Sequence, residues 1–136
     1  MNKKSNKLTI QLDKPVRKVF AFTINAKNTP LWIDSIVKEE TSEWPVKVGS
    51  VYKNQNKAGQ WSEYTVTALK ENVIFELLSK DKNYHVRYTY RAINAETCEL
   101  EYFEWVDRGE LEEPFTLNTL KKLKSAMGVN RKRLDG

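Results

Sequence analysis

Residues 84–106, YHVRYTYRAINAETCELEYFEWV, hold two runs of alternating side chains, 84–92 and 97–106, with a short polar turn at 94–96 between them. Successive side chains of a β-strand point to opposite faces, so this alternation predicts two half-buried antiparallel strands. One face would carry Tyr84, Val86, Tyr88, Tyr90, Cys98, Leu100, Tyr102 and Glu104. The other would carry His85, Arg87, Thr89, Arg91, Glu99, Glu101, Phe103 and Trp105. Because the second set is mostly charged, we expect the first set to face the interior.

Further strand-like segments precede this pair. They span residues 7–12, 37–41, 50–56, 60–69 and 73–79, and the turns between the later ones are 56–59, 70–72 and 80–83. Consecutive strands joined by turns this short form an antiparallel meander.

Helical patterning surrounds the strands. Two short helices are predicted after the first strand, one capped by Asp13 with Pro15 in its first turn, the other capped by Thr29. A long amphipathic helix is predicted at 115–127, with its apolar stripe on Leu117, Leu120, Leu123 and Met127. The fold class is therefore α+β, an antiparallel sheet whose apolar face is covered by a long C-terminal helix.

The chain has 136 residues, which is the size of one domain. We expect a single domain over 1–136, with a folded core at 7–127 and flexible ends at 1–6 and 130–136. No apolar run approaches membrane-spanning length, and the first residues resemble no export signal. The single Cys98 cannot form an internal disulfide. We expect a cytoplasmic protein that does not insert into membranes.

The net charge of +5 is unevenly distributed. Residues 1–7 contribute three lysines, and 121–136 contribute six basic residues against one acidic residue. The body, 8–120, has 14 basic and 17 acidic residues, so it is mildly acidic. The positive charge therefore belongs to the chain ends and does not indicate an anionic partner.

Residues 15–36, PVRKVFAFTINAKNTPLWIDSI, followed by VKVGSVY at 46–52, resemble the opening of the polyketide cyclase/dehydrase and START-like lipid-transfer superfamily (SRPBCC). The matching residues are Pro15, Val19, Phe20, Asn28, Pro30, Trp32, Gly49 and Tyr52. The segment TLNTLKKLKSAM at 116–127 is similar to the closing helix of that superfamily. The resemblance implies a helix-grip fold, in which a curved antiparallel sheet wraps around the C-terminal helix and a cavity lies between them. The superfamily shares no functional motif that could be transferred to this chain.

The inward faces of the predicted strands nominate a cavity lining. Its members are Trp32, Tyr64, Val66, Phe75, Leu77, Tyr88, Tyr90, Leu100, Tyr102, Phe115 and Leu120. An apolar pocket with a few polar groups is typical of small-molecule sites. The alternative is that these side chains simply fill a core.

Glu104 is the candidate catalytic residue, because an inward carboxyl group beside tyrosines could act as an acid or a base. The alternative is a solvated residue at the rim. His85 falls on the charged face, and no second histidine accompanies it, so we expect no metal site and no cofactor. Cys98 has no recognisable partner base and is interpreted as a small buried side chain.

These observations leave three functions open and disfavour a fourth. The first is a small cytosolic binder or carrier of an apolar or aromatic molecule, lipid-like or polyketide-like. The second is an enzyme of the cyclase/dehydrase type that uses the same cavity. The third is a protein-interaction module resembling homologues of a heat-shock ATPase activator, and a homodimer is also open. Nucleic-acid binding is disfavoured because alternation places Arg87 and Arg91 opposite Tyr88 and Tyr90.

Overall fold

The computed structural model describes residues 3–135, in which seven strands form one antiparallel sheet in the order β1-β7-β6-β5-β4-β3-β2. The strands are β1 (Ser5–Leu12), β2 (Lys38–Thr41), β3 (Val51–Gln55), β4 (Trp61–Lys70), β5 (Ile74–Ser79), β6 (Tyr84–Asn94) and β7 (Thr97–Val106). From β2 to β7 each strand pairs with the next along the chain, which confirms the predicted meander. β1 pairs with β7, so the first and last strands are neighbours.

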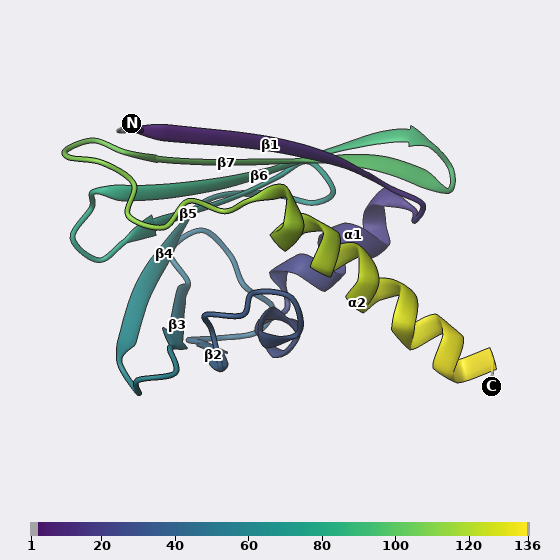
Figure 1. Ribbon diagram of the computed structural model, residues 1–136, viewed down its shortest axis with the longest axis horizontal. Coiled ribbons are helices and arrows are strands. Elements are labelled where there is room, and N and C mark those ends of the chain that lie inside the picture. The colour runs from purple at the N-terminus through teal and green to yellow at the C-terminus, as the bar shows by residue number, and fades with distance from the viewer. Residues whose placement is uncertain (1–2, 136) are drawn as a thin grey trace.

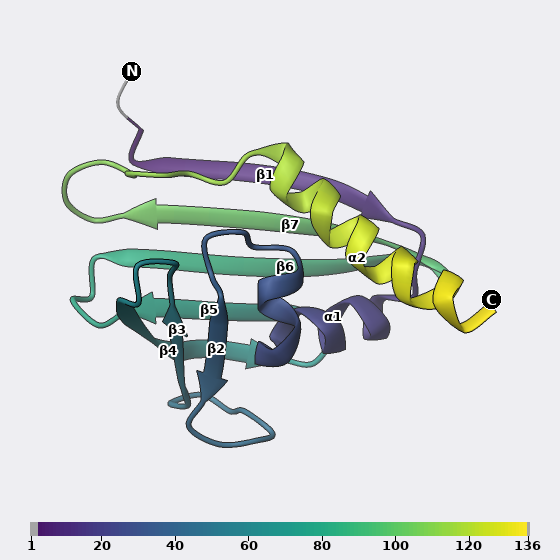
Figure 2. The same ribbon diagram turned by 60° about the horizontal axis from the view of Figure 1, so that its bottom comes forward.

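Three helical segments lie on one face of this sheet (Figures 1 and 2), namely α1 (Val16–Ile24), the 3-10 helix η1 (Ala26–Leu31) and α2 (Leu117–Asp135). α1 and η1 connect β1 to β2, and α2 packs against β1 and η1. The end of the sheet formed by β2, β3 and β4 bends toward the helices (Figure 1). This arrangement is the predicted α+β helix-grip fold. No helix within residues 3–135 is both long and apolar enough to cross a membrane.

The strand pair predicted at 84–106 lies inside the sheet, where β7 and β6 are flanked by β1 and β5. Tyr88 lies opposite Tyr102 and Tyr90 lies opposite Leu100 across the β6–β7 ladder. Along β7 every second residue from Cys98 to Val106 is buried, as the alternation predicts. The helices complete the core with buried residues of α1 and α2, which are Val19, Phe20, Leu120, Leu123 and Met127.

The alternation of β4 and β5 is less regular than predicted. A bulge between Val66 and Ala68 shifts the register, so that Ala68 lies opposite Glu76 and Leu69 lies opposite the inward-facing Phe75. Sequence periodicity instead predicts Ala68 on the inner face. A bulge adds one residue to a strand and bends it, which produces the sheet curvature at this end. Val73, also predicted inward, precedes β5 and is exposed.

The segment boundaries differ from the prediction at several ends. β1 begins at Ser5 rather than residue 7, because Asn6 is buried and hydrogen-bonded within the fold. Residues 1, 2 and 136, which belong to the ends predicted to be flexible, lie outside the described residues. The second short helix is η1, which begins at Ala26 and contains Pro30. α2 begins at Leu117 and continues to Asp135, beyond the predicted end at 127.

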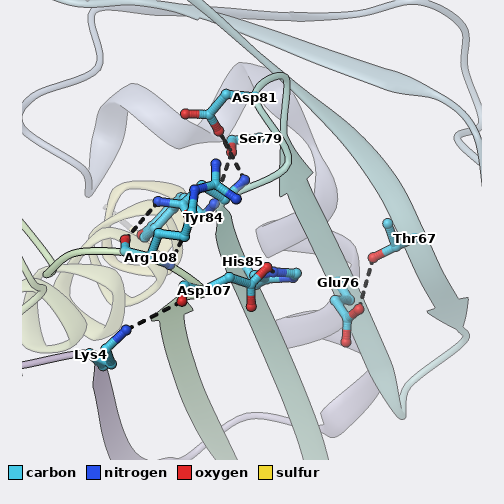
Figure 3. Close-up of polar contacts among 10 residues, drawn as sticks. Lys4, Thr67, Glu76, Ser79, Asp81, Tyr84, His85, Asp107 and Arg108 are labelled. Atoms are coloured by element: carbon cyan, nitrogen blue, oxygen red, sulfur yellow. Dashed lines mark hydrogen bonds and ion pairs between the residues drawn. The ribbon is translucent and has the colours of Figure 1, made fainter.

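The outer face of β6 and β7 carries a stack of flat side chains. The His85 ring lies 4.5 Å from that of Trp105, and Trp105 lies 4.8 Å from Phe103. Arg87 and Lys7 lie over the Trp105 and Phe103 rings. His85 also contacts the Asp107 carboxylate at 2.9 Å (Figure 3). These apolar surfaces are covered by neighbouring side chains, which explains how aromatic residues are accommodated on a largely charged face.

Leu100 tests the packing of this core. We expect Leu100→Ala to lower the free energy of unfolding by about 2 to 5 kcal/mol, because Leu100 is fully buried between sheet and helices and its removal leaves a cavity. The matched control is Ile93→Ala on β6, whose side chain is 53% exposed and whose loss should cost less than about 0.5 kcal/mol. Urea unfolding measures both values, and equal losses would contradict the assignment of Leu100 to the core.

Candidate ligand-binding cavity

A cavity of about 1190 Å³ lies on the inner side of the curved sheet. Its walls come from the inner faces of β3 to β7, from the segment that joins η1 to β2, and from the loop 107–116 that leads into α2. Polar residues of the β5–β6 turn and of the same loop form part of the wall, so one end of the cavity is bounded by turns. At that end Asn83 donates to the Arg108 carbonyl at 3.0 Å and accepts from the Arg108 amide at 2.8 Å. Figure 3 shows Arg108 there beside Tyr84, Ser79 and Asp81.

Six of the eleven predicted lining residues are on the cavity wall, namely Tyr64, Phe75, Leu77, Tyr88, Tyr102 and Phe115. The structure places the other five in the core and not on the wall: Trp32, Val66, Tyr90, Leu100 and Leu120. Their strand positions share the inner face, but helices fill that part of it. Tyr90, for example, packs edge-on against Phe20 of α1 and shares a 2.7 Å hydrogen bond with Thr23. Alternation identifies a face of the sheet, and it does not say which part of that face a helix covers.

Tyrosine hydroxyl groups supply much of the polar surface inside the cavity. Tyr52 donates to the carbonyl of Ile24 at 2.5 Å, at the end of α1. Tyr84 donates to the Glu104 carboxylate at 2.6 Å, and its oxygen lies 3.4 Å from that of Tyr102. Burial raises the pKa of each of these tyrosines above its usual range. The cavity therefore presents neutral hydroxyl groups throughout the physiological pH range.

Tyr88 differs from these tyrosines because its hydroxyl group makes no hydrogen bond within residues 3–135. Among the described side chains only the Trp32 indole nitrogen is fully buried without a partner, so the Tyr88 hydroxyl group is accessible from the cavity. Its side chain is 5% exposed and belongs to the cavity wall. Burial raises the pKa of Tyr88 well above its usual range, so the hydroxyl group keeps its proton. A polar group that faces a cavity normally bonds to water or to a bound molecule. The Tyr88 hydroxyl group is therefore available to a molecule in the cavity.

Glu104 is a buried carboxylate at the wall, only 1% exposed, rather than a solvated rim residue. One oxygen accepts from the Tyr84 hydroxyl group at 2.6 Å. The other accepts from the Asn6 amide at 2.8 Å and from the backbone amide of Phe115 at 2.8 Å. Asn6 also donates to the Phe115 carbonyl at 2.9 Å. Glu104 on β7 thus connects β1, β6 and the residues just before α2.

These contacts give Glu104 a structural role. Both of its oxygens accept hydrogen bonds from groups of the chain itself, which is how a buried carboxylate is stabilised. Its predicted catalytic role stays a prediction. The sequence places Glu104 on the inner face, but its partners Asn6 and Phe115 are outside the alternating segment, and no local pattern identifies them.

Glu39 is a second carboxylate on the cavity wall, and the sequence analysis did not identify it. It lies on the edge strand β2 and accepts hydrogen bonds from Thr29 at 2.5 Å and from Asn54 at 3.2 Å. Burial raises the pKa of Glu39, against the opposing effect of these two hydrogen bonds. The segment Lys38–Thr41 is entirely polar, which is typical of a solvated strand, and so no sequence signal indicates that Glu39 is half-buried.

The remaining reactive side chains do not form a site. Within residues 3–135 no group of three or more His, Cys, Asp or Glu side chains is arranged to hold a metal ion. Cys98 is buried in the sheet, and burial raises the pKa of its thiol, which disfavours the reactive thiolate. His85 lies on the outer face, as the alternation predicts.

No protein-family model matches the chain, and no curated protein matches it. Many solved structures share its architecture. A START superfamily protein from Mycobacterium smegmatis has a TM-score of 0.68 at 14% identity, over 96% of this chain and 98% of that one. The chain has the helix-grip fold of START-like proteins.

Two further solved structures extend this likeness. Norcoclaurine synthase from Thalictrum flavum, in complex with dopamine and hydroxybenzaldehyde, has a TM-score of 0.66 at 10% identity, over 96% of this chain and 87% of that one. The di-domain ARO/CYC protein BexL of the BE-7585A biosynthetic pathway has a TM-score of 0.64 at 12% identity, and covers 95% of this chain and 43% of its own. Identities this low establish the shared helix-grip fold and leave the function to be argued from the cavity.

The structural role of Glu104 predicts a graded effect of substitution. Glu104→Ala leaves the Asn6 amide and the Phe115 backbone amide without an acceptor, and we expect it to lower the free energy of unfolding by about 3 to 5 kcal/mol. Glu104→Gln preserves one acceptor oxygen and adds an amide that can donate to Tyr84, so we expect a loss of about 1 kcal/mol. Urea unfolding measures both.

The matched control is Glu99→Ala on the outer face of the same strand, where the carboxylate pairs with exposed Arg91. We expect this change to cost less than about 0.5 kcal/mol. If Glu104→Ala were as mild as Glu99→Ala, the connection between β1, β6, β7 and α2 would be wrong.

Substitution of Glu39 is expected to have the opposite effect on stability to substitution of Glu104. Because burial raises the pKa of Glu39, the folded state binds the proton more tightly than the unfolded state, and stability falls as the pH rises through that pKa. Glu39→Gln removes this cost, so we expect it to raise the free energy of unfolding at neutral pH. The gain should disappear in acid, where Glu39 is protonated. Unfolding curves across pH measure the difference, and a destabilised variant at neutral pH would contradict it.

Proposed function

We propose that this protein binds a small apolar or aromatic molecule, lipid-like or polyketide-like, in the cavity between its sheet and its helices. The main supporting observation is a cavity of about 1190 Å³, partly open to solvent, whose wall contains a Tyr88 hydroxyl group that makes no hydrogen bond within residues 3–135. This volume is somewhat above the roughly 300 to 1,000 Å³ of typical ligand sites, which also combine apolar walls with a few polar groups. The neighbouring aromatic rings of Phe75 and Tyr102, 5.5 and 5.3 Å from Tyr88, suit a flat apolar ligand.

Carrier activity is favoured over catalysis of the cyclase/dehydrase kind. The predicted acid or base, Glu104, already accepts three hydrogen bonds from Tyr84, Asn6 and Phe115. Three of the roughly four acceptor sites of this carboxylate are thus occupied by donors of the chain, which leaves little of it for a ligand proton, whereas binding requires no proton transfer. We place the carrier in the cytoplasm, because its single cysteine is a buried free thiol.

A paired substitution on β5 tests the binding site. Leu77 lies on the cavity wall and Leu78 lies on the outer face of the same strand. We expect Leu77→Trp to fill part of the cavity and weaken binding of N-phenyl-1-naphthylamine by at least about tenfold, while Leu78→Trp binds this neutral probe like the unmodified protein. Titration of the probe fluorescence measures both affinities.

Equal affinity in the two variants, or no saturable binding by the unmodified protein, would contradict a ligand site in this cavity. Native mass spectrometry of the purified protein provides a second measurement, since a bound small molecule adds its mass to that of the chain. The same spectrum distinguishes a monomer from a homodimer.

A further inference from the structure

The charges on the cavity wall are predominantly negative. Seven carboxyl groups and two basic side chains contribute to it. Four of the carboxyl groups belong to Glu39, Glu63, Asp81 and Glu104, and three follow one another on the loop before α2, at Glu110, Glu112 and Glu113. The basic side chains are those of Lys80 and Arg108. The chain as a whole has a net charge of +5, so the acidic wall is a local property of the cavity and not a consequence of composition.

The carboxylates of Glu63, Glu104 and Glu39 differ in the groups that neutralise or bond to them. Glu63 lies near two lysines, Lys53 at 3.6 Å and Lys80 at 4.0 Å. Glu104 accepts three hydrogen bonds from the chain. Glu39 has only neutral partners, the Thr29 hydroxyl group and the Asn54 amide, and no cation within ion-pair distance among the described residues. A half-buried carboxylate without a cation is destabilising, as its raised pKa indicates.

A second observation concerns Tyr88, which lies on the same cavity wall as Glu39. Glu39 shares the cavity wall with Tyr52, Tyr64 and Tyr88, and its negative charge adds to the effect of burial in raising the pKa of all three. The side chain of Tyr88 is only 5% exposed, and its hydroxyl group makes no hydrogen bond within residues 3–135. Tyrosine ring faces also attract cations, because their π-systems are negative. A carboxylate that lacks a cation, a free hydroxyl group and several aromatic rings therefore surround one volume.

We propose that the ligand of this cavity carries a positively charged nitrogen, which pairs with Glu39 while its apolar or aromatic body contacts the tyrosines. This inference rests on the proposed binding function and specifies the chemical class of the ligand. The acidic residues at the loop end, Glu110, Glu112 and Glu113, would attract such a cation and repel an anion of the same shape. The hydroxyl group of Tyr88 would bond to a polar group of the same ligand.

Three probes of one shape test the proposal. They are 2-(2-naphthyl)ethylamine, 2-(2-naphthyl)ethanol and 3-(2-naphthyl)propionate, which are a cation, a neutral molecule and an anion at neutral pH. We expect the amine to bind about tenfold more tightly than the alcohol, and the propionate to bind most weakly. Isothermal titration calorimetry measures the three dissociation constants. The net positive charge of the protein would by itself produce the opposite order of amine and propionate.

Variants of two neighbouring residues of β2 test whether Glu39 causes the preference for the amine. Glu39→Gln should reduce the preference for the amine over the alcohol to about twofold or less while leaving the affinity for the alcohol unchanged. Glu40→Gln is the matched control, because Glu40 is the next residue of β2, is exposed and pairs with Lys38 at 3.5 Å. This variant should keep the full preference. Since Glu39→Gln is expected to stabilise the fold, a lost preference would not result from unfolding.

The outcomes distinguish a failure of the proposed binding function from a failure of the proposed cationic ligand. If none of the three probes binds, the cavity is not a site for small aromatic molecules and the proposed function fails. If the alcohol or the propionate binds as tightly as the amine, the binding function stands and the cationic ligand is wrong. If the amine is preferred equally by the Glu39→Gln and Glu40→Gln variants, the proposed pairing with Glu39 is wrong.

Discussion

The hydrogen bonds of the buried Glu104 carboxylate hold the architecture together. Its acceptor atoms bring Asn6, Tyr84 and the amide of Phe115 to one point, and those groups come from β1, β6 and the loop just before α2. A desolvated carboxylate is tolerated only where donors surround it, so each of these segments is fixed relative to the others. The loop before α2, which forms part of the cavity wall, takes its position from this contact.

The cavity follows from the curvature of the sheet and from where the helices stop. The bulge at Val66 to Ala68 bends β4, while α1 and α2 cover only one part of the inner face. The cross-strand pair Tyr90 and Leu100 lies under the helices, and the next inward-facing pair, Tyr88 and Tyr102, borders the cavity. One continuous aromatic face thus serves as core at one end and as a binding wall at the other.

Local alternation was sufficient to predict the strands and the inner face of 84–106, because the period of a strand is a property of consecutive residues. The cavity was predicted only in part, since its extent depends on which inner residues α1 and α2 cover. Glu39 was missed because its burial arises from η1 and β3, through Thr29 and Asn54, rather than from its own segment. Glu104 was correctly predicted on the inner face of the sheet, whereas its partner Asn6 is 98 residues away in the sequence and has no local signature.

The pairing of β1 with β7 has a consequence for how the chain folds. β1 is synthesised first, yet its register partners, from Trp105 for Ser5 to Cys98 for Leu12, are made last among the strands. The strands from β2 to β7 are joined by short turns, whereas β1 can pair with β7 only after the whole meander between them has been made. Closing a loop of this length has an entropic cost that local hairpins avoid, and contacts of high sequence separation slow folding. We therefore expect the joining of β1 to β7 to come late in assembly, and until it occurs the edge of β7 lacks its strand partner.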